Sequence, residues 1–453
     1  MSRALRPVDP AWIAAQRLAS ARELRRACSA TDIERYREGF GWRLSPARGS
    51  VLASYRIACW NPEPDYFHHW IRDSAIVLRA VPLAMTADPG AARFWAGFIA
   101  DFTDFSLKIS DPARRGPAVN PLRATARADH LRFLRDDGEL AALTGAAWLE
   151  EPRFAPDGSP DLENWSRPQD DGPALRATSL MAVLAAVPEP ALPQALRLIA
   201  RDLGHTLAVA GRAAIGPWEE APPKRTSFAL IAQWDALDRG ADLLRRGVLT
   251  GRPFSPQQSG PELCPDALSA AAKRLEALIL GARDAAGALR ESIESETLDA
   301  ASCLALLHAD RTAGPFALTG DLMEATMGAL DQEFAALYPI NAGRAAPAVG
   351  RWRDDLYFEG QPWYPTTLGF AAIGYRIAAI AGDPAAFARA EARLALIAQL
   401  APDPPGALPE QFDRQSGAPR SCLALSWSAA AFLETAHARD QAIAALSPAR
   451  AAR

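Results

Sequence analysis

Apolar residues recur along most of this chain with the spacing of helices that bury one face. The pattern i, i+1, i+4, i+7, i+8 is that of one helical face, and it occurs at Ile76, Val77, Ala80, Leu83 and Ala84. A similar spacing appears near the other end, at Leu425, Ala429, Phe432, Leu433 and Ala436. About a dozen such segments are predicted as helices: 10–28, 70–87, 90–110, 172–187, 190–210, 225–247, 264–283, 297–311, 318–336, 361–382, 384–400 and 425–445.

Prolines and glycines separate several of these segments where helices must stop. Asp88-Pro89-Gly90, Pro188-Glu189-Pro190 and Gly382-Asp383-Pro384 each fall between two of them. Proline after a helix end, or in the first turn of the next helix, is what the sterics of the helix permit. The segments therefore form consecutive helix pairs.

Patterns of period two, typical of strands, are short and few, and the best of them is 50–58. We therefore predict an all-α fold with one domain over residues 1–453. Long polar loops follow about every second helix and carry most of the unusual residues, a common layout for an active site. These loops are predicted at 45–66, 111–170, 211–224, 250–263, 337–360 and 402–424.

Composition and charge narrow the function classes. A net charge of −4 over 453 residues gives no reason to expect nucleic acid or an anionic membrane as partner. No window approaches the apolar length that spans a bilayer, and the N-terminal stretch lacks the apolar centre of a signal peptide. The five cysteines are odd in number and scattered, which argues against a disulfide framework or a zinc site. We expect a cytoplasmic protein.

Several loops combine tryptophan or tyrosine with carboxylates and arginine. The first, NPEPDYFHHWIRDSA, contains Tyr66, Trp70, Arg72 and Asp73. Aromatic faces pack against the C–H face of a sugar, and guanidinium and carboxylate groups bind its hydroxyls through charge-assisted hydrogen bonds. The alternative for Arg72 and Asp73 is an ion pair in the first turn of a helix, where aspartate is favourable anyway.

Two further stretches offer catalytic carboxylates. In Trp218-Glu219-Glu220, repulsion between adjacent carboxylates and a partly dry setting would keep one of them protonated, as a general acid requires. The alternative is an exposed acidic pair at a helix start. Glu410 lies in a loop stiffened by proline that could aim its carboxylate, and the alternative is a solvated surface glutamate.

Metal and nucleotide chemistry lack sequence support. The six histidines form no ligand pattern, since His68 and His69 are adjacent and no H-E-x-x-H occurs. Neither G-x-G-x-x-G, nor a P-loop, nor G-x-S-x-G is present. We expect neither a metal nor a cofactor.

Taken together, five blocks resemble one family, the glucoamylases and their relatives in glycoside hydrolase family 15. In chain order they are NPEPDYFHHWIRDSAIVL, WSRPQDDGPALRAT, WEEAPPKRTSFALIAQWDAL, VGRWRDDLYFEGQPWY and PEQFDRQSGAPRSCLALSWSAAAFL, between residues 61 and 433. The resemblance implies an (α/α)6 barrel, a six-hairpin toroid of twelve helices in two rings, which agrees with the helix count above.

The resemblance also implies roles at matching positions. Glu219 corresponds to the general acid and Glu410 to the general base of an inverting exo-hydrolase that releases β-glucose from the non-reducing ends of α-1,4-linked, and possibly α-1,6-linked, glucans. Arg72 and Asp73 correspond to residues that hold the terminal sugar. The other matching substrate-binding positions are Tyr66, Trp70, Trp165, Trp218, Glu220, Arg351 and Trp427.

The chain also departs from the family pattern. His68-His69 and Ile71 replace more usual residues, and Pro222-Pro223-Lys224-Arg225 follows the acidic pair, so the linkage preference stays open. We expect no starch-binding module, no N-terminal β-domain, a monomer, and soluble oligosaccharides or glycogen branches as substrates. Two alternatives remain: the same barrel acting on trehalose, isomaltose or dextran ends, and a non-catalytic glucan-sensing domain.

Overall fold

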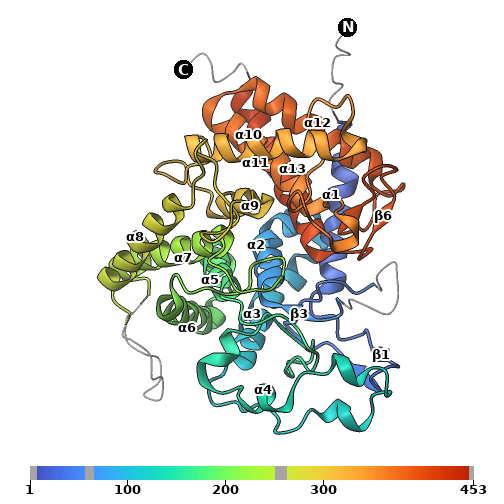
Figure 1. The fold of residues 1–453 in the computed structure, drawn as a ribbon, viewed down its shortest axis with the longest axis vertical. Coiled ribbons are helices and arrows are strands. Elements are labelled where there is room, and N and C mark those ends of the chain that lie inside the picture. Colours follow the sequence, from blue (N-terminus) through green and yellow to red (C-terminus); the bar gives the residue numbers. More distant parts are fainter. Residues whose placement is uncertain (1–7, 57–65, 250–262, 448–453) are drawn as a thin grey trace.

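The computed structural model describes residues 8–56, 66–249 and 263–447, and within them helices dominate (Figure 1). The long helices are α1 (Pro10–Ala27), α2 (Ile71–Ala87), α3 (Ala92–Ile109), α5 (Asp171–Val183), α6 (Leu192–Val209), α7 (Ser227–Arg245), α8 (Pro265–Gly281), α9 (Ala300–Ala309), α10 (Asp321–Leu337), α11 (Tyr364–Ala381), α12 (Pro384–Leu400) and α13 (Ser426–Leu446). Each of the twelve predicted segments overlaps one of these helices. A further short helix, α4 (Asp137–Ala141), lies inside the long loop after α3.

Six of the helices form a closed inner ring. Along this ring α2 packs against α5, α5 against α7, α7 against α9, α9 against α11, α11 against α13, and α13 against α2. The other six, α1, α3, α6, α8, α10 and α12, pack outside it, so that inner and outer helices alternate along the chain. This is the predicted (α/α)6 barrel.

The sequence explains which helices lie inside. All ten residues of α9 are buried, because this helix carries apolar side chains on every face, as an inner helix must. By contrast, α1 buries one stripe that includes Ile13, Ala21 and Leu24. Capping residues fix several starts: Asp9 and Asp383 cap α1 and α12, each followed by proline, and Asp299 caps α9.

A long segment precedes each inner helix, and the described parts of these segments gather at one end of the ring. They run over 28–70, 110–170, 210–226, 282–299, 338–363 and 401–425. Short 3₁₀ turns occur in these loops and between helices, at Pro89–Ala91, Pro121–Ala124, Leu131–Phe133, Gly145–Leu149, Leu184–Ala186, Glu189–Ala191, Pro339–Asn341 and Tyr357–Glu359. Figure 1 shows the loop with α4 as a separate lobe beside α3 and β3.

Three antiparallel two-stranded ladders stiffen these loops: β1 (Arg35–Arg37) with β2 (Trp42–Leu44), β3 (His69–Trp70) with β4 (Arg153–Phe154), and β5 (Gln411–Phe412) with β6 (Pro419–Arg420). The stretch 50–58, the best of the period-two patterns, lies in the predicted loop 45–66, and in its described part only Val51 makes an isolated bridge, to Cys28. Residues 57 and 58 lie outside the described residues. Alternation of polar and apolar residues here reflects a loop that packs on the core.

One close approach sets the geometry at the start of two inner helices. A Cβ atom on Gly172, in the first turn of α5, would lie 2.9 Å from Cγ2 of Ile71, the first residue of α2. Only glycine permits this contact, and it brings Asp171 within 3.3 Å of the Arg72 guanidinium.

Two other predictions concern the whole chain. In the described part of the chain, the helices are too short or too polar to cross a bilayer. The single domain expected over residues 1–453 stays a prediction, and the predicted loop 250–263 falls almost wholly outside the described residues.

Candidate active site

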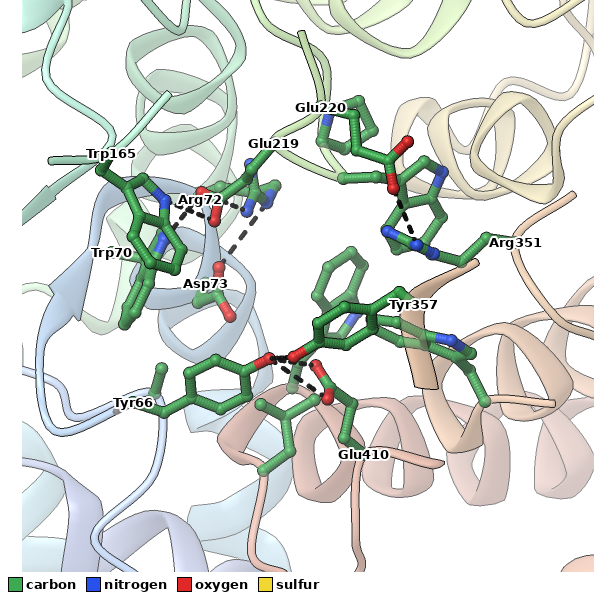
Figure 2. A pocket seen from close by; sticks show the side chains of 16 residues that line it. Tyr66, Trp70, Arg72, Asp73, Trp165, Glu219, Glu220, Arg351, Tyr357 and Glu410 are labelled. Carbon is green, nitrogen blue, oxygen red and sulfur yellow. Dashed lines mark hydrogen bonds and ion pairs between the residues drawn. The ribbon is translucent and has the colours of Figure 1, made fainter. Parts of the chain in front are cut away.

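A pocket of about 300 Å³ opens at the end of the ring where the long loops gather (Figure 2). It is lined by Ala53, Tyr66, Trp70, Arg72, Asp73, Trp165, Pro217, Trp218, Glu219, Glu220, Arg351, Tyr357, Trp363, Glu410, Leu425 and Trp427. All eleven residues predicted for the site are among them. Residues separated by more than 350 positions thus meet in one cavity.

Glu219 enters this pocket as a hydrogen-bond acceptor. Its Oε1 accepts from Trp70 Nε1 at 2.7 Å, Gln169 Nε2 at 3.0 Å and Arg72 Nη2 at 3.3 Å. Its Oε2 accepts from Trp165 Nε1 at 2.7 Å. Four donors from two segments, one at the start of α2 and one before α5, therefore fix the orientation of this one carboxyl group.

The carboxylates of Glu219 and Glu220 point in different directions. The sequence argument that repulsion between them keeps one of them protonated is therefore wrong. Glu219 has a φ of +65°, in the left-handed region that non-glycine residues rarely adopt. Figure 2 shows the side chain of Glu219 turned toward Trp165 and that of Glu220 toward Arg351. Glu220 accepts from Arg351 Nη2 at 2.9 Å, so the two neighbours serve different sides of the pocket.

The structure agrees with both sequence interpretations of Arg72 and Asp73, as an ion pair in the first turn of a helix and as residues of the site. They stand in the first turn of α2, and both are buried against the pocket, 4% and 7% exposed. Arg72 also donates to Gln169 at 3.0 Å. Burial raises the pKa of Asp73 to about 6, although the nearby Arg72 opposes this rise. Oδ2 of Asp73 is itself buried and lies 3.6 Å from Nε of Arg72 in an ion pair, which holds this carboxyl group at the edge of the pocket.

Glu410 is buried at 4% exposure, so the interpretation as a solvated surface glutamate is wrong. Its backbone N–H donates to Cys422 and its carbonyl accepts from Tyr364, which fixes the residue just before β5. Its carboxyl group accepts from Ser421 Oγ, and from the Tyr66 hydroxyl at 3.2 Å. Burial raises the pKa of Glu410 to about 7, against the lowering effect of the Ser421 and Tyr66 donors.

Figure 2 shows Glu219 and Glu410 on opposite sides of the same cavity. Aromatic rings fill much of the wall between them. Trp218 stacks on Trp427 with ring centres 6.2 Å apart and lies 5.2 Å from Trp363. Trp218 is itself held by Asp299, which accepts from its Nε1 at 2.8 and 2.9 Å. A cavity with apolar rings and buried carboxylates suits a sugar.

Five lining residues were not predicted: Ala53, Pro217, Tyr357, Trp363 and Leu425. Tyr357 and Trp363 lie in the block 349–364, where other residues were singled out, and the Tyr357 hydroxyl lies 2.6 Å from that of Tyr66. The many aromatic residues in that block could have identified Tyr357 and Trp363 as site residues. Ala53 and Leu425 carry no such signal, since only tertiary packing places them.

One group of potential metal ligands occurs in the described residues, at His68, Asp161 and Glu163. Its carboxylates already bind arginines: Arg153 Nε lies 2.9 Å from Asp161, Arg167 Nη2 lies 2.6 Å from Asp161, and Arg37 pairs with Glu163. Guanidinium groups occupy the oxygens that a cation would need, so the residues do not fit a metal. This cluster supports the wall formed by Trp70 and Trp165.

Comparison with known proteins decides the family. Residues 139–437 match the family model for glycosyl hydrolases family 15. The chain belongs to this family. Among family relatives, glucoamylase-1 of Arthroderma benhamiae is 27% identical over 89% of this chain and 66% of its own length. The glucoamylase of Neurospora crassa is 25% identical over 88% of this chain and 65% of its own length.

The family fold extends over the whole ring. The solved glucoamylase of Saccharomycopsis fibuligera superposes with a TM-score of 0.73 at 20% identity, covering 98% of this chain and 99% of that one. That of Hormoconis resinae gives 0.72 at 23% identity, over 95% and 73%. The chain spans about two thirds of the length of the curated relatives it matches.

Proposed function

We propose that this chain is an exo-acting, inverting α-glucosidase of the glucoamylase type, which releases β-glucose from non-reducing ends of α-1,4-linked or α-1,6-linked glucans. The observation that carries this proposal is the pair Glu219 and Glu410, on opposite sides of one aromatic-lined pocket. Family membership supports the same activity.

Glu219 is proposed as the general acid. Three donors hold its Oε1, whereas Oε2 has one indole partner. Oε2 is therefore the oxygen best able to carry the proton that passes to the glycosidic oxygen as the bond breaks. The indole of Trp165 keeps that oxygen directed into the pocket.

Glu410 is proposed as the general base that takes a proton from the attacking water. An inverting hydrolase needs room for this water, roughly 6.5–9.5 Å between its two carboxyl groups. The Tyr66 and Ser421 donors favour the ionised form of Glu410 and fix its orientation. Attack from the face opposite the leaving group converts an α-linkage into β-glucose.

Arg72 and Asp73, which both line the pocket, are proposed to grip the terminal sugar. A negative charge on Asp73 would also stabilise the positive charge that develops on the sugar ring in the transition state. Arg351 and Glu220, paired at 2.9 Å, would contact the leaving group. These steps use only side chains of this chain.

Cellular setting and assembly are also proposals. We propose a cytoplasmic monomer that acts on soluble oligosaccharides or glycogen branches. The described cysteines Cys28, Cys264 and Cys303 are free thiols, as in proteins of reducing compartments, and Cys59 lies outside the described residues. One relative, of Saccharomyces cerevisiae, is named an intracellular sporulation-specific glucoamylase. Light scattering of the purified protein tests the monomer.

Proton NMR of maltose, isomaltose and trehalose digests tests the activity, the linkage and the anomer together. We expect β-glucose to appear first, from maltose. Cleavage of trehalose or isomaltose in preference to maltose would favour the alternative substrates. Sugar binding by calorimetry without any hydrolysis would instead favour a glucan-sensing domain.

A further inference from the structure

His69, one of the two adjacent histidines that depart from the family pattern, lies next to the pocket without lining it. It is the first residue of β3 and is fully buried, and the next residue, Trp70, donates to Glu219. The centre of the His69 ring lies 4.9 Å from that of Phe105 and 6.3 Å from that of Phe102. An imidazole therefore stands within apolar packing directly behind the wall of the pocket.

The ring of His69 makes one hydrogen bond within the described part of the chain. Nδ1 accepts from the backbone N–H of Val51 at 2.9 Å, so the proton of the neutral ring resides on Nε2. Nε2 is buried and has no hydrogen-bond partner among the described residues. Burial, and to a smaller extent the charge of Arg176, lowers the pKa of His69 to about 3. The ring therefore keeps its acceptor at neutral pH.

The segment 51–54, which His69 holds, connects two walls of the pocket. The N–H of Ala53 donates to the carbonyl of His68 at 3.0 Å. The N–H of Ser54 donates to the carbonyl of Tyr66, also at 3.0 Å. On the other side, the N–H of Ser426 donates to the carbonyl of Ala53 at 2.9 Å. Ser426 begins α13 and lies between two residues of the pocket lining, so this segment joins both walls.

Among the N–H groups of 51–54, only that of Val51 depends on a side chain. The others donate to backbone carbonyls, which a substitution does not remove. Val51 is itself buried, so loss of the imidazole acceptor leaves its N–H unpaired away from water, which is costly. The segment recovers a partner for this group only if it moves.

Tyr66 transmits such a movement to the reacting groups. Its carbonyl accepts from Ser54, and its hydroxyl donates to Glu410 at 3.2 Å and lies 2.6 Å from the hydroxyl of Tyr357. Ala53 lines the pocket directly. A shift of the segment 51–54 therefore displaces both a lining residue and the donor that orients the proposed general base.

We propose that His69 is a positioning residue of the active site, which holds Val51 and, through the segment 51–54, fixes Tyr66 against Glu410. This inference rests on the proposed function and adds to it a residue outside the pocket. The position requires an acceptor at the place of Nδ1 and a group that fills the space beside Phe105. Asparagine supplies the acceptor, because its side-chain oxygen, like Nδ1 of histidine, is bonded to Cγ. Phenylalanine supplies the ring alone.

The test compares His69→Phe with His69→Asn. We expect His69→Phe to lower kcat on maltose about tenfold with a smaller change in KM, since the loss concerns the placement of a reacting group. His69→Asn should restore most of kcat. His308→Phe is the matched control, because His308 is also buried, lies beside a phenylalanine, Phe228, and is absent from the pocket lining. Thermal unfolding of each variant measures its stability, which the control should lower without a matching loss of kcat.

Hydrogen exchange measured by mass spectrometry on peptides that cover 51–54 gives a readout that needs no turnover. Exchange there should be faster in His69→Phe than in the wild type, and close to the wild type in His69→Asn. The inference would be overturned by wild-type kcat in His69→Phe, or by a loss in His69→Asn or His308→Phe as large as in His69→Phe. An inactive wild type would instead contradict the proposed function, whereas the exchange rates would still decide whether His69 holds the segment.

Discussion

The guanidinium carbon of Arg153 lies 3.7 Å from the centre of the Trp165 ring, on the side of the indole away from solvent, since Arg153 itself is fully buried. It also lies 4.9 Å from the Trp70 ring. Both indoles donate to Glu219. One buried cation therefore supports both tryptophans that hold the proposed general acid.

Replacement of Arg153 by lysine should lower kcat more than it changes KM. Lysine keeps the charge but loses the planar group that packs on the rings, and a displacement of about 1 Å at a reacting group can cost on the order of a hundredfold. Steady-state kinetics on maltose and thermal unfolding, measured together, check this expectation. Arg439→Lys, in the buried pair with Glu391 far from the pocket, should lower stability without a matching loss of kcat. Equal kinetic losses in the two variants would contradict a positioning role.

Replacing either proposed catalytic glutamate should remove turnover but not sugar binding. Glu219→Gln and Glu410→Gln should each lower kcat by about 100- to 10,000-fold, the range of general acid–base catalysis. Calorimetry with a slowly hydrolysed oligosaccharide measures the remaining affinity. Glu220→Gln is the comparison, and its main effect should fall on KM. Near-normal turnover in either of the first two variants would show that the roles are wrongly assigned.

The activity should fall as pH drops through about 7. The proposed base Glu410 acts only when ionised, and burial raises its pKa to about 7. Ser421→Ala removes a donor that lowers this pKa, so the acidic limb of the kcat/KM profile should move to higher pH. Ser416→Ala, in the same loop but bonded to Asp413, should leave the limb in place. An acidic limb that does not move in the Ser421 variant would show that this limb does not report the titration of Glu410.

The same group should make stability depend on pH. Below 4.5, its ordinary pKa, Glu410 is protonated in both the folded and the unfolded chain. Between 4.5 and about 7 the unfolded chain loses the proton and the folded chain keeps it, so the free energy of unfolding falls as pH rises. Glu410→Gln has no such proton, and at pH 8 it should be more stable than the wild type by on the order of 3 kcal/mol.

Urea unfolding at pH 4 and pH 8 measures this difference, which should be small at the lower pH. Glu324→Gln changes an exposed glutamate on α10 and serves as control. A wild type and a Glu410 variant that differ by the same amount at both pH values would contradict the pH dependence.

Much of the fold could be predicted because its helices obey local rules. Proline and aspartate at helix starts, as at Asp9-Pro10 and Asp383-Pro384, fix boundaries to within a few residues. The alternation at 50–58 belongs, in its described part, to a loop packed on the core and not to a strand. Apolar residues on every face mark α9 as an inner helix, but which inner helices pair with one another around the ring depends on contacts between segments far apart in the chain.

The site was predictable as a set of residues but not as a network. The sequence blocks around Trp70, Glu219 and Glu410 contain residues that were predicted for the site and that line the pocket. Nothing local tells that the backbone of Glu219 adopts a positive φ, which separates it from Glu220 and removes the expected repulsion. Likewise Arg153 reads as an ordinary charge in the sequence, and only the pairing of β3 with β4 places it opposite Trp70.

The pocket draws one of its walls from residues upstream of the stretch that defines the family. The match covers 139–437, yet Tyr66 and Trp70 come from the segment before α2, and Arg72 and Asp73 from the first turn of α2, the helix that completes the ring against α13. A fragment cut to the matched boundaries would lack that helix and leave a gap in the barrel. Glu219 would then lose Trp70 and Arg72, two of its four donors, so such a fragment, even if it folded, would carry both glutamates but lack the pair proposed to grip the terminal sugar.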